Sequence, residues 1–322
     1  MRFVLLCIVL IAAVRAEYVA DSMNKALSDT KTHMYFILSN STTRAKLIYN
    51  FITTLDVDPE HVTIVHATDT SLVPLSRFGD FVEAGWVGNW YWKGLVKEGT
   101  KKFVEHNEHA AVRGRWALQL SVVRAMEAFV KSPHENMMLF EDDVAVSPDV
   151  ALEKVVSTTI NMIRLPANKW DLQYLGWCWE CAGMSSRSFT PDGPLYTKAL
   201  FPLCRHSIMY SRRTIQWYLK VWRPPHFLGG DEQLIRLACN YKVKKIRTME
   251  PLFIQSNINA YQDSHLGNTD LKRSFFDWTE CDRWGNLCKS MPNGTAQFNT
   301  LGETPPDDLD SVTNFFMKRR EQ

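Results

Sequence analysis

The stretch MYFILSNSTTRAKLIYNFITTLDVDPEHVTIVH, residues 34–66, decides the fold of this chain. It opens with an apolar run at 34–39, which is typical of a buried strand, and residues 61–66 repeat that pattern. Between them, residues 43–55 carry apolar side chains at helical spacing. The apolar helical face consists of Ala45, Ile48, Phe51 and Ile52. A strand, a helix and a second strand in this order predict a parallel pair joined by a crossover helix.

The same alternation continues beyond this stretch. Residues 70–112 interrupt it, helical spacing returns at 116–129, and a strand at 136–140 runs into three acidic residues. Ser147-Pro148-Asp149 has the composition of a helix start. Later strands are predicted at 170–175, 204–210, 243–247 and 252–255, and later helices at 212–221 and 231–241. The chain is therefore predicted to adopt an α/β, Rossmann-type fold, with a mostly parallel sheet flanked by helices.

The N-terminus indicates the compartment. Residues 1–16 combine Arg2, an apolar run of 12 residues and small side chains at Val14 and Ala16, which together are typical of a cleaved signal peptide. The run is shorter than the roughly 20 residues that a spanning helix needs. We therefore expect no transmembrane span, and a mature chain that is secreted or lies in the lumen of the secretory pathway (endoplasmic reticulum or Golgi).

The rest of the chain is expected to hold one domain. Residues 17–31 are polar and are interpreted as a linker, and the polar, turn-rich residues 269–322 are interpreted as a C-terminal extension. The single predicted domain occupies residues 32–268.

Charge and composition exclude several classes of protein. The 322 residues include 37 Lys and Arg and 35 Asp and Glu, and 45% of the residues are hydrophobic. Loss of Arg2 and Arg15 with the signal peptide would leave the two signs balanced. A neutral chain with ordinary globular composition argues against disorder and against nucleic acid as a partner.

Six cysteines remain after the predicted cleavage. They are Cys178, Cys181, Cys204, Cys239, Cys281 and Cys288. In an oxidising compartment this even number favours disulfides. Two alternatives are a redox centre at the Cys-x-x-Cys of 178–181 and a zinc site that adds Cys204 and His206. Glycosylation sequons begin at Asn40 and Asn293.

The sequence Phe140-Glu141-Asp142-Asp143 is the main candidate for chemistry. Three carboxylates at the exit of an apolar strand repel one another unless a cation lies between them. Mg²⁺ and Mn²⁺ prefer one or two carboxylates together with substrate phosphates. The motif therefore indicates either a divalent metal site for a diphosphate or a solvated acidic turn.

Several segments together resemble glycosyltransferase family 25, which includes lipooligosaccharide and collagen galactosyltransferases. The resemblance is carried by FEDDV at 140–144, KWDLQYLG at 169–176 and GGDEQL at 229–234, in that order. Further similar pieces are YFILSNSTTRAKL at 35–47, RWALQLSVVRAMEAF at 115–129, HSIMYSRRTIQWYL at 206–219 and IQSNINAYQDSHLGN at 254–268. The resemblance covers residues 34–268.

The resemblance implies a GT-A fold and metal-dependent transfer of a hexose, such as galactose, with inversion. The donor would be a UDP-sugar, the metal Mn²⁺ or Mg²⁺, and the acceptor a hydroxyl on a glycan or glycoprotein. Asp143 would be the direct metal ligand, and Asp142 or Glu141 would hold the ribose, the metal or its waters. Asn40 and Arg44 would bind the nucleotide, although a glycan on the Asn40 sequon would crowd the donor.

A base on the acceptor side is also implied by the resemblance. Asp231 and Glu232 follow two glycines, which allow the backbone to approach a ligand closely. The alternative for Asp231 is a structural helix cap, and His226 is a second candidate base. The Trp86, Trp90, Tyr91 and Trp92 cluster is interpreted either as an acceptor platform or as core. The rival function is a carbohydrate-binding or adhesion protein that keeps the fold without turnover.

Overall fold

The structure is a computed structural model that describes part of the chain, with gaps. The described residues are 23–69, 108–177, 195–199, 202, 204–221, 234, 238 and 243–256. The chain divides into two compact units. Of the described residues, the second unit holds 68–69, 108–121, 221, 234 and 238, and the first unit holds all the others. The acidic motif and the sheet belong to the first unit. Among the described helices, none has the length and apolar character needed to cross a membrane.

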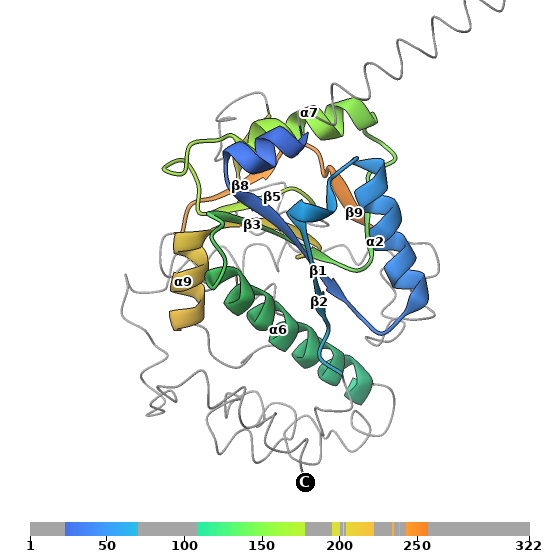
Figure 1. Ribbon diagram of the computed structural model, residues 1–322. Helices are drawn as coiled ribbons and strands as arrows, with labels where there is room; N and C mark the ends of the chain where they lie inside the picture. The colour runs from blue at the N-terminus through green and yellow to red at the C-terminus, as the bar shows by residue number, and fades with distance from the viewer. Residues whose placement is uncertain are drawn as a thin grey trace, which may run out of the picture. The chain divides into compact units, whose positions relative to one another are not determined.

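The first unit is built on a seven-stranded sheet (Figure 1). In spatial order the strands are β2 (Val62–His66), β1 (Thr32–Leu38), β3 (Asn136–Glu141), β7 (Ser207–Ser211), β5 (Leu172–Tyr174), β8 (Lys245–Thr248) and β6 (Tyr196–Lys198). Strands β2, β1, β3, β5 and β8 run in one direction, whereas β7 and β6 run in the other. The sheet is thus mixed and largely parallel, and the predicted α/β class is confirmed.

Helices cover both faces of this sheet (Figure 1). On one face, helical residues 23–29, α2 (Thr42–Thr54) and α7 (Leu152–Ile163) share a buried core with alternate residues of β1 and β3. On the other face lie α9 (Arg212–Val221) and the last residues of α6 (Glu108–Val130), where the ring of Phe129 meets Tyr35 of β1 edge-on. The period-two alternation along each strand therefore supplies both cores.

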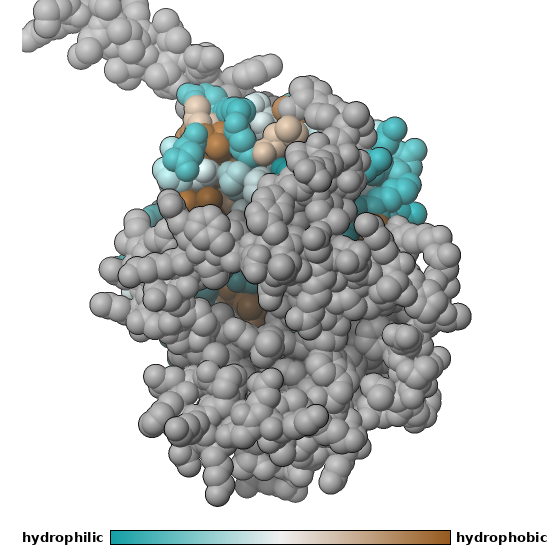
Figure 2. Space-filling view, turned by 180° about the vertical axis from the view of Figure 1, so that it is seen from behind, coloured by the Kyte–Doolittle hydropathy of each residue, from teal (hydrophilic) through white to brown (hydrophobic). Residues whose placement is uncertain are grey.

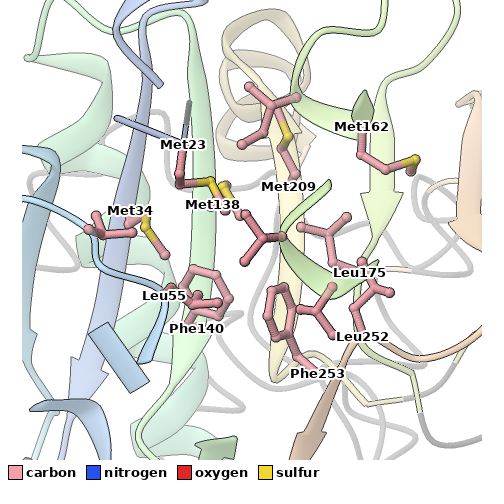
Figure 3. Packing of buried hydrophobic residues seen from close by; sticks show 14 of the residues in the cluster. Met23, Met34, Leu55, Met138, Phe140, Met162, Leu175, Met209, Leu252 and Phe253 are labelled. Carbon is pink, nitrogen blue, oxygen red and sulfur yellow. The ribbon is translucent and has the colours of Figure 1, made fainter. Parts of the chain in front are cut away.

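The core beneath α2 and α7 combines leucine, isoleucine and valine side chains with several methionines and phenylalanines (Figure 3). Phe140 is the central ring: it stacks on Phe36 with centroids 4.8 Å apart and lies 5.2 Å from Phe51. Phe253 completes the group, 5.2 Å from Phe51 and 5.8 Å from Phe140. Phe140 directly precedes Glu141 in the chain, so the acidic residues follow directly from this phenylalanine cluster.

The structure differs from the sequence-based expectation in several places. Strand β6 was not among the predicted strands, and it pairs antiparallel with β8. Residues 23–29, expected within a polar linker, are helical, because Met23, Ala26 and Leu27 are all buried in the core. A second sheet, not predicted, pairs β4 (Val144–Val146) with β9 (Phe253–Gln255) antiparallel. The helix expected to begin near Ser147 begins later: α7 has Ala151 at its N-cap position, with no capping side chain.

The described surface is mainly polar. Figure 2 shows hydrophilic residues over most of the coloured area, with a few apolar residues between them. Among the described residues, the exposed large hydrophobic side chains are Tyr49, Ile64, Leu152 and Met249. These come from four separate segments, so they argue for ordinary surface positions rather than for one apolar patch.

Candidate functional site

The site follows from the path of the chain between β1 and β3. From β1 the chain passes through α2 to β2, on one side of β1, whereas β3 lies on the other side. Helices α2 and α6, which precede β2 and β3, lie on opposite faces of the sheet. Such a switch point opens a crevice outside the carboxyl ends of the two central strands, and open α/β sheets bind their ligands there. Because β1 and β3 are parallel, with Ile37 opposite Glu141, the residues after both strands meet at one edge.

Asp142 is fixed by the residue that follows β1. The backbone N–H of Ser39 donates to Asp142 Oδ2 over 2.8 Å, and the Ser39 hydroxyl donates a short bond to the same oxygen. These two residues are 103 positions apart in the chain and meet only because their strands are paired. Asp142 is thereby held in one orientation at the mouth of the crevice.

Arg44 reaches the acidic pair from the first turn of α2. Ser41 is the N-cap residue of this helix, and its side chain accepts a hydrogen bond from the Arg44 N–H. The Arg44 guanidinium extends to the acidic turn, where Nη1 lies 3.5 Å from Asp142 Oδ1 and 3.3 Å from Asp143 Oδ2. With its side chain only 8% exposed, Arg44 makes these ion pairs largely out of water. It therefore neutralises part of the charge of both carboxylates.

Asp143 is the least satisfied carboxylate of the pair. Its backbone carbonyl accepts a hydrogen bond of 2.6 Å from the Ser256 N–H, just after β9. Its Oδ1 is buried and finds no hydrogen-bond partner among the described residues. Burial raises the pKa of Asp143, and Asp142 raises it further, whereas Arg44 and His206 act in the opposite sense. An oxygen in this state is well suited to a cation.

The support beneath this pair is apolar and tightly packed. Phe140 and Phe253 close the core side of the turn, so the carboxylates lie next to a region of low polarity. Glu141, the last residue of β3, follows the strand alternation to the face opposite Phe140. Its N–H donates to the His206 carbonyl over 3.3 Å. Glu141 therefore joins β3 to the segment before β7, while Asp142 and Asp143 form the charged pair.

His206 locks the second sheet onto the first. Its Nε2 lies at hydrogen-bond distance, 3.0 Å, from the Phe253 carbonyl, and the side chain is fully buried. Gly176 passes between them: a Cβ there would lie 2.4 Å from His206 Nε2 and 2.5 Å from the Phe253 oxygen. Only glycine fits this crossing. The crossing places β9, and hence Ser256, against the acidic turn.

Cys204 precedes this crossing and is disulfide-bonded. A cysteine in a disulfide has no thiolate to offer, so the zinc set that adds Cys204 to His206 is wrong. Cys178 and Cys181, with the other cysteines, lie outside the described residues, so the redox alternative stays untested. The Cys204 sulfur lies 4.0 Å from Gln255 Oε1, beside β9.

The predicted site residues divide into three groups. Arg44, Asp142 and Asp143 come together, while Asn40 lies exposed in the same β1–α2 connection and Glu141 faces away. Asp231, Glu232 and His226 lie outside the described residues, as do Trp86, Trp90, Tyr91 and Trp92.

Ser39, His206 and Ser256 were not predicted as parts of the site. Ser39 carried a weak signal, because a polar residue directly after a buried strand reaches the same edge as Asp142. His206 was named only for the alternative zinc site, and Ser256 carried no signal, since its contact with Asp143 depends on the unpredicted pairing of β4 with β9.

Metal binding at this pair is chemically reasonable without further protein ligands. No group of three or more His, Cys, Asp or Glu side chains suited to a metal occurs in the part of the chain that the structure describes. Mg²⁺ and Mn²⁺ are commonly held by one or two carboxylates, with substrate phosphates and water completing the shell. Asp142 and Asp143 meet that smaller requirement, and the unpartnered Asp143 Oδ1 gives the ion a place to bind.

Comparison with known proteins does not identify a family for this chain. Neither a protein-family model nor a curated protein matches this sequence. Among solved structures, the crystal structure of A197 from STIV aligns with 70% of this chain and 94% of that chain, at 12% sequence identity and a TM-score of 0.32. A likeness at this level carries no argument about function. The candidate site therefore rests on its own geometry.

Proposed function

We propose that this protein is a metal-dependent glycosyltransferase with a GT-A-like fold. It would transfer a hexose, such as galactose, from a UDP-sugar to a hydroxyl group of a glycan or glycoprotein, with inversion. One observation carries the proposal: a buried Asp143 carboxylate with an unpartnered oxygen lies at the switch point between β1 and β3. The resemblance of its motifs to glycosyltransferase family 25 supports the same assignment.

The acidic pair is suited to hold Mn²⁺ or Mg²⁺. Asp143 would bind the ion directly through Oδ1, and Asp142, already oriented by Ser39, would bind it or the ribose. When bound, such an ion would neutralise the charge that develops on the diphosphate as a leaving group.

The β1–α2 connection is suited to the nucleotide. The first turn of α2 contains no acidic residue, and it follows the carboxyl end of β1. Such a helix start attracts phosphate. Arg44 adds a guanidinium in that turn, and the exposed Asn40 adds an amide beside it. We therefore assign the donor diphosphate to this connection.

The chemical step requires a base on the acceptor. The acceptor oxygen forms a bond to the anomeric carbon, the bond from that carbon to the diphosphate oxygen breaks, and the hydroxyl proton passes to a carboxylate. We assign this proton to Asp231 or Glu232 on the strength of the family resemblance. Attack from the face opposite the leaving group inverts the anomeric configuration.

The compartment proposed is the lumen of the secretory pathway or the exterior of the cell. The disulfide at Cys204 supports this, because disulfides persist in oxidising compartments and are rare elsewhere.

Turnover of UDP-hexoses tests the assignment. The purified full-length protein is incubated with UDP-galactose and UDP-glucose, with Mn²⁺ or with EDTA, and release of UDP is measured. We expect release that needs the metal and that falls at least 100-fold in Asp143→Asn. The matched control is Asp29→Asn, which makes the same change at an exposed carboxylate and should leave turnover unchanged. Absence of turnover with every common UDP-hexose would overturn the assignment.

One observation favours the rival class, a carbohydrate-binding protein without turnover. Arg44 bridges both carboxylates and partly neutralises them without any metal. For that class, glycan binding would persist in EDTA and in Asp143→Asn, and UDP release would be absent in every variant. Glycan-array binding measured beside UDP release separates the two classes.

A further inference from the structure

Arg44 pairs with two carboxylates at once. Its Nη1 lies 3.3 Å from Asp143 Oδ2 and 3.5 Å from Asp142 Oδ1. Both distances are longer than the 2.7–2.9 Å of a tight charge-assisted hydrogen bond. The Arg44 side chain is only 8% exposed, so water screens this charge interaction little.

The charges of this group do not balance. Asp142 and Asp143 carry two negative charges when ionised, and Arg44 supplies one positive charge. The two oxygens of Asp142 already face Ser39 and Arg44, whereas Asp143 keeps Oδ1 without a partner among the described residues. A divalent ion at Oδ1 would lie close to the guanidinium that pairs with Oδ2 of the same carboxylate. Two cations so close repel each other, most strongly where water is excluded.

We propose that Arg44 is an exchangeable counter-ion for the acidic pair. In the metal-free protein it holds Asp142 and Asp143 together, and it competes with a divalent cation for Asp143. When a nucleotide diphosphate enters, the Arg44 guanidinium moves from the carboxylates to a phosphate oxygen and leaves Asp143 to the metal. Arg44 is thus a positioning residue that couples the two ligands, and this inference rests on the proposed function.

The position of Arg44 means that its side chain has to move only a short distance in this exchange. Its backbone is anchored in the first turn of α2, where Ser41 caps the helix, so only the side chain has to turn. The N–H groups of that same turn are the ones that attract phosphate. The old and new partners of the guanidinium therefore lie within reach of one flexible side chain, and the fold does not have to change.

Coupling between the ligands is the measurable consequence. A diphosphate that draws Arg44 away strengthens metal binding, and by thermodynamic reciprocity the metal strengthens diphosphate binding by the same factor. A structural arginine has a different signature, because its removal loosens the acidic turn and weakens metal binding. The sign of the change in metal affinity therefore separates the two roles.

Mn²⁺ binding to the full-length protein, followed by electron paramagnetic resonance, tests this inference. Wild type, Arg44→Gln and Arg44→Lys are titrated with Mn²⁺, with and without UDP, and UDP binding is followed by calorimetry. Arg213→Gln is the matched control, since Arg213 is an exposed arginine of α9 that pairs with Asp171. Circular dichroism and the urea midpoint verify folding of each variant.

We expect Arg44→Gln to bind Mn²⁺ about fivefold to tenfold more tightly than wild type without UDP, within the usual range of coupling between sites. The same variant should bind UDP at least tenfold more weakly, and UDP should tighten its Mn²⁺ binding less than in wild type, because only the direct contact between the phosphates and the ion remains. Arg44→Lys keeps a charge but only one point of contact, so its tightening should lie between those of Arg44→Gln and wild type. Arg213→Gln should match wild type.

Unchanged or weaker Mn²⁺ binding in folded Arg44→Gln would overturn the exchange role and leave the proposed function intact. If Arg44→Gln does not fold, wild type and Arg44→Lys still decide: an equal effect of UDP on Mn²⁺ affinity in both overturns the inference. A wild type that binds neither Mn²⁺ nor UDP overturns the proposed function as well.

Discussion

The two ends of β1 and β3 carry the same kinds of polar group and use them differently. At the amino ends, Arg212 lies over the ring of Phe129 and donates to the carbonyls of Val130, Ser132 and His134. At the carboxyl ends, Arg44 faces the carboxylates of Asp142 and Asp143. Arg212 joins the end of α6 to the start of α9, and its donors are directed at fixed backbone acceptors.

The difference lies in how fully each group is satisfied. Donors of Arg212 meet backbone oxygens at 2.6–3.0 Å, whereas Arg44 lies 3.3 and 3.5 Å from its partners, and Asp143 Oδ1 has none among the described residues. Fully paired groups contribute stability, and an incompletely paired buried carboxylate lowers it. We infer that the amino end stabilises the fold and the carboxyl end is built for a ligand.

The largest effect is expected at the carboxyl end. Asp143→Asn should lower Mn²⁺ affinity and UDP release by about 100-fold or more, a loss of roughly 3 kcal/mol in transition-state stabilisation. Because burial raises the pKa of Asp143, its ionised form opposes folding at neutral pH, and the variant should be as stable as wild type or more so. Urea unfolding at pH 7 measures this. A variant that loses stability and keeps turnover would show that the carboxyl end stabilises the fold and does not bind the ligand.

The next effect is expected at the amino end. Arg212→Met keeps a side chain over Phe129 and removes the donors to three carbonyls, so it should lower the free energy of unfolding by about 2–4 kcal/mol. The neighbouring Arg213→Met removes an exposed pair with Asp171 and should change it by less than about 1 kcal/mol. Mn²⁺ affinity of the folded protein should be the same in both. A folded Arg212→Met with altered Mn²⁺ affinity would show that the two ends are coupled.

A smaller effect, on stability and on Mn²⁺ binding together, is expected at Gly176, where the segment after β5 crosses β9. Gly176→Ala places a methyl group against His206 and the Phe253 carbonyl, where no space exists. Overpacking of this kind lowers stability by about 1–3 kcal/mol. The displaced β9 also moves Ser256, so Mn²⁺ binding should weaken. Full stability together with unchanged Mn²⁺ affinity would contradict the role assigned to this crossing.

The smallest effect is expected in how stability depends on pH, through a histidine at the amino end of β1. Burial, helped by His134 and His61, lowers the pKa of His33 from 6.5 to about 4. The folded protein therefore binds a proton at His33 more weakly than the unfolded chain does, and stability is lost as the pH falls from about 6.5 toward 4. His33→Phe, which lacks the titrating group, should flatten this part of the profile. Urea midpoints at pH 7, 5.5 and 4.5 measure it, and parallel profiles would contradict the assignment.

Much of the fold was predictable, because a long segment with a regular apolar period favours one type of secondary structure. The helix predicted at 212–221 is found as α9 with the same bounds, and the strands predicted at 34–39 and 61–66 are found as β1 and β2. The strand predicted at 252–255 is found as β9, but its pairing with β4 in a second sheet was not predictable. Strand β4 has three residues, too few to show a period, and it pairs with β9 across more than 100 positions.

The site was predictable only where a motif and a strand end coincide. Asp142 and Asp143 follow an apolar strand, and Arg44 opens the helix after a parallel one, so their meeting follows from sheet geometry. The start expected for α7 at Ser147 was wrong, because the backbone N–H of Ser147 instead donates to the Leu252 carbonyl next to the second sheet. A local sequence pattern fails to predict structure where a segment distant in sequence supplies the hydrogen-bond partner.

The pairing of β4 with β9 has a consequence for the order in which the molecule matures. All seven strands of the main sheet precede Phe253 in the chain, so every strand of that sheet is synthesised before β9. The backbone bond from Ser256 to Asp143 joins residues 113 positions apart. Until Ser256 has been added, the chain contains every strand of the main sheet but lacks this bond to the acidic turn. The geometry for a cation is therefore completed only after the last strand of the main sheet has been made.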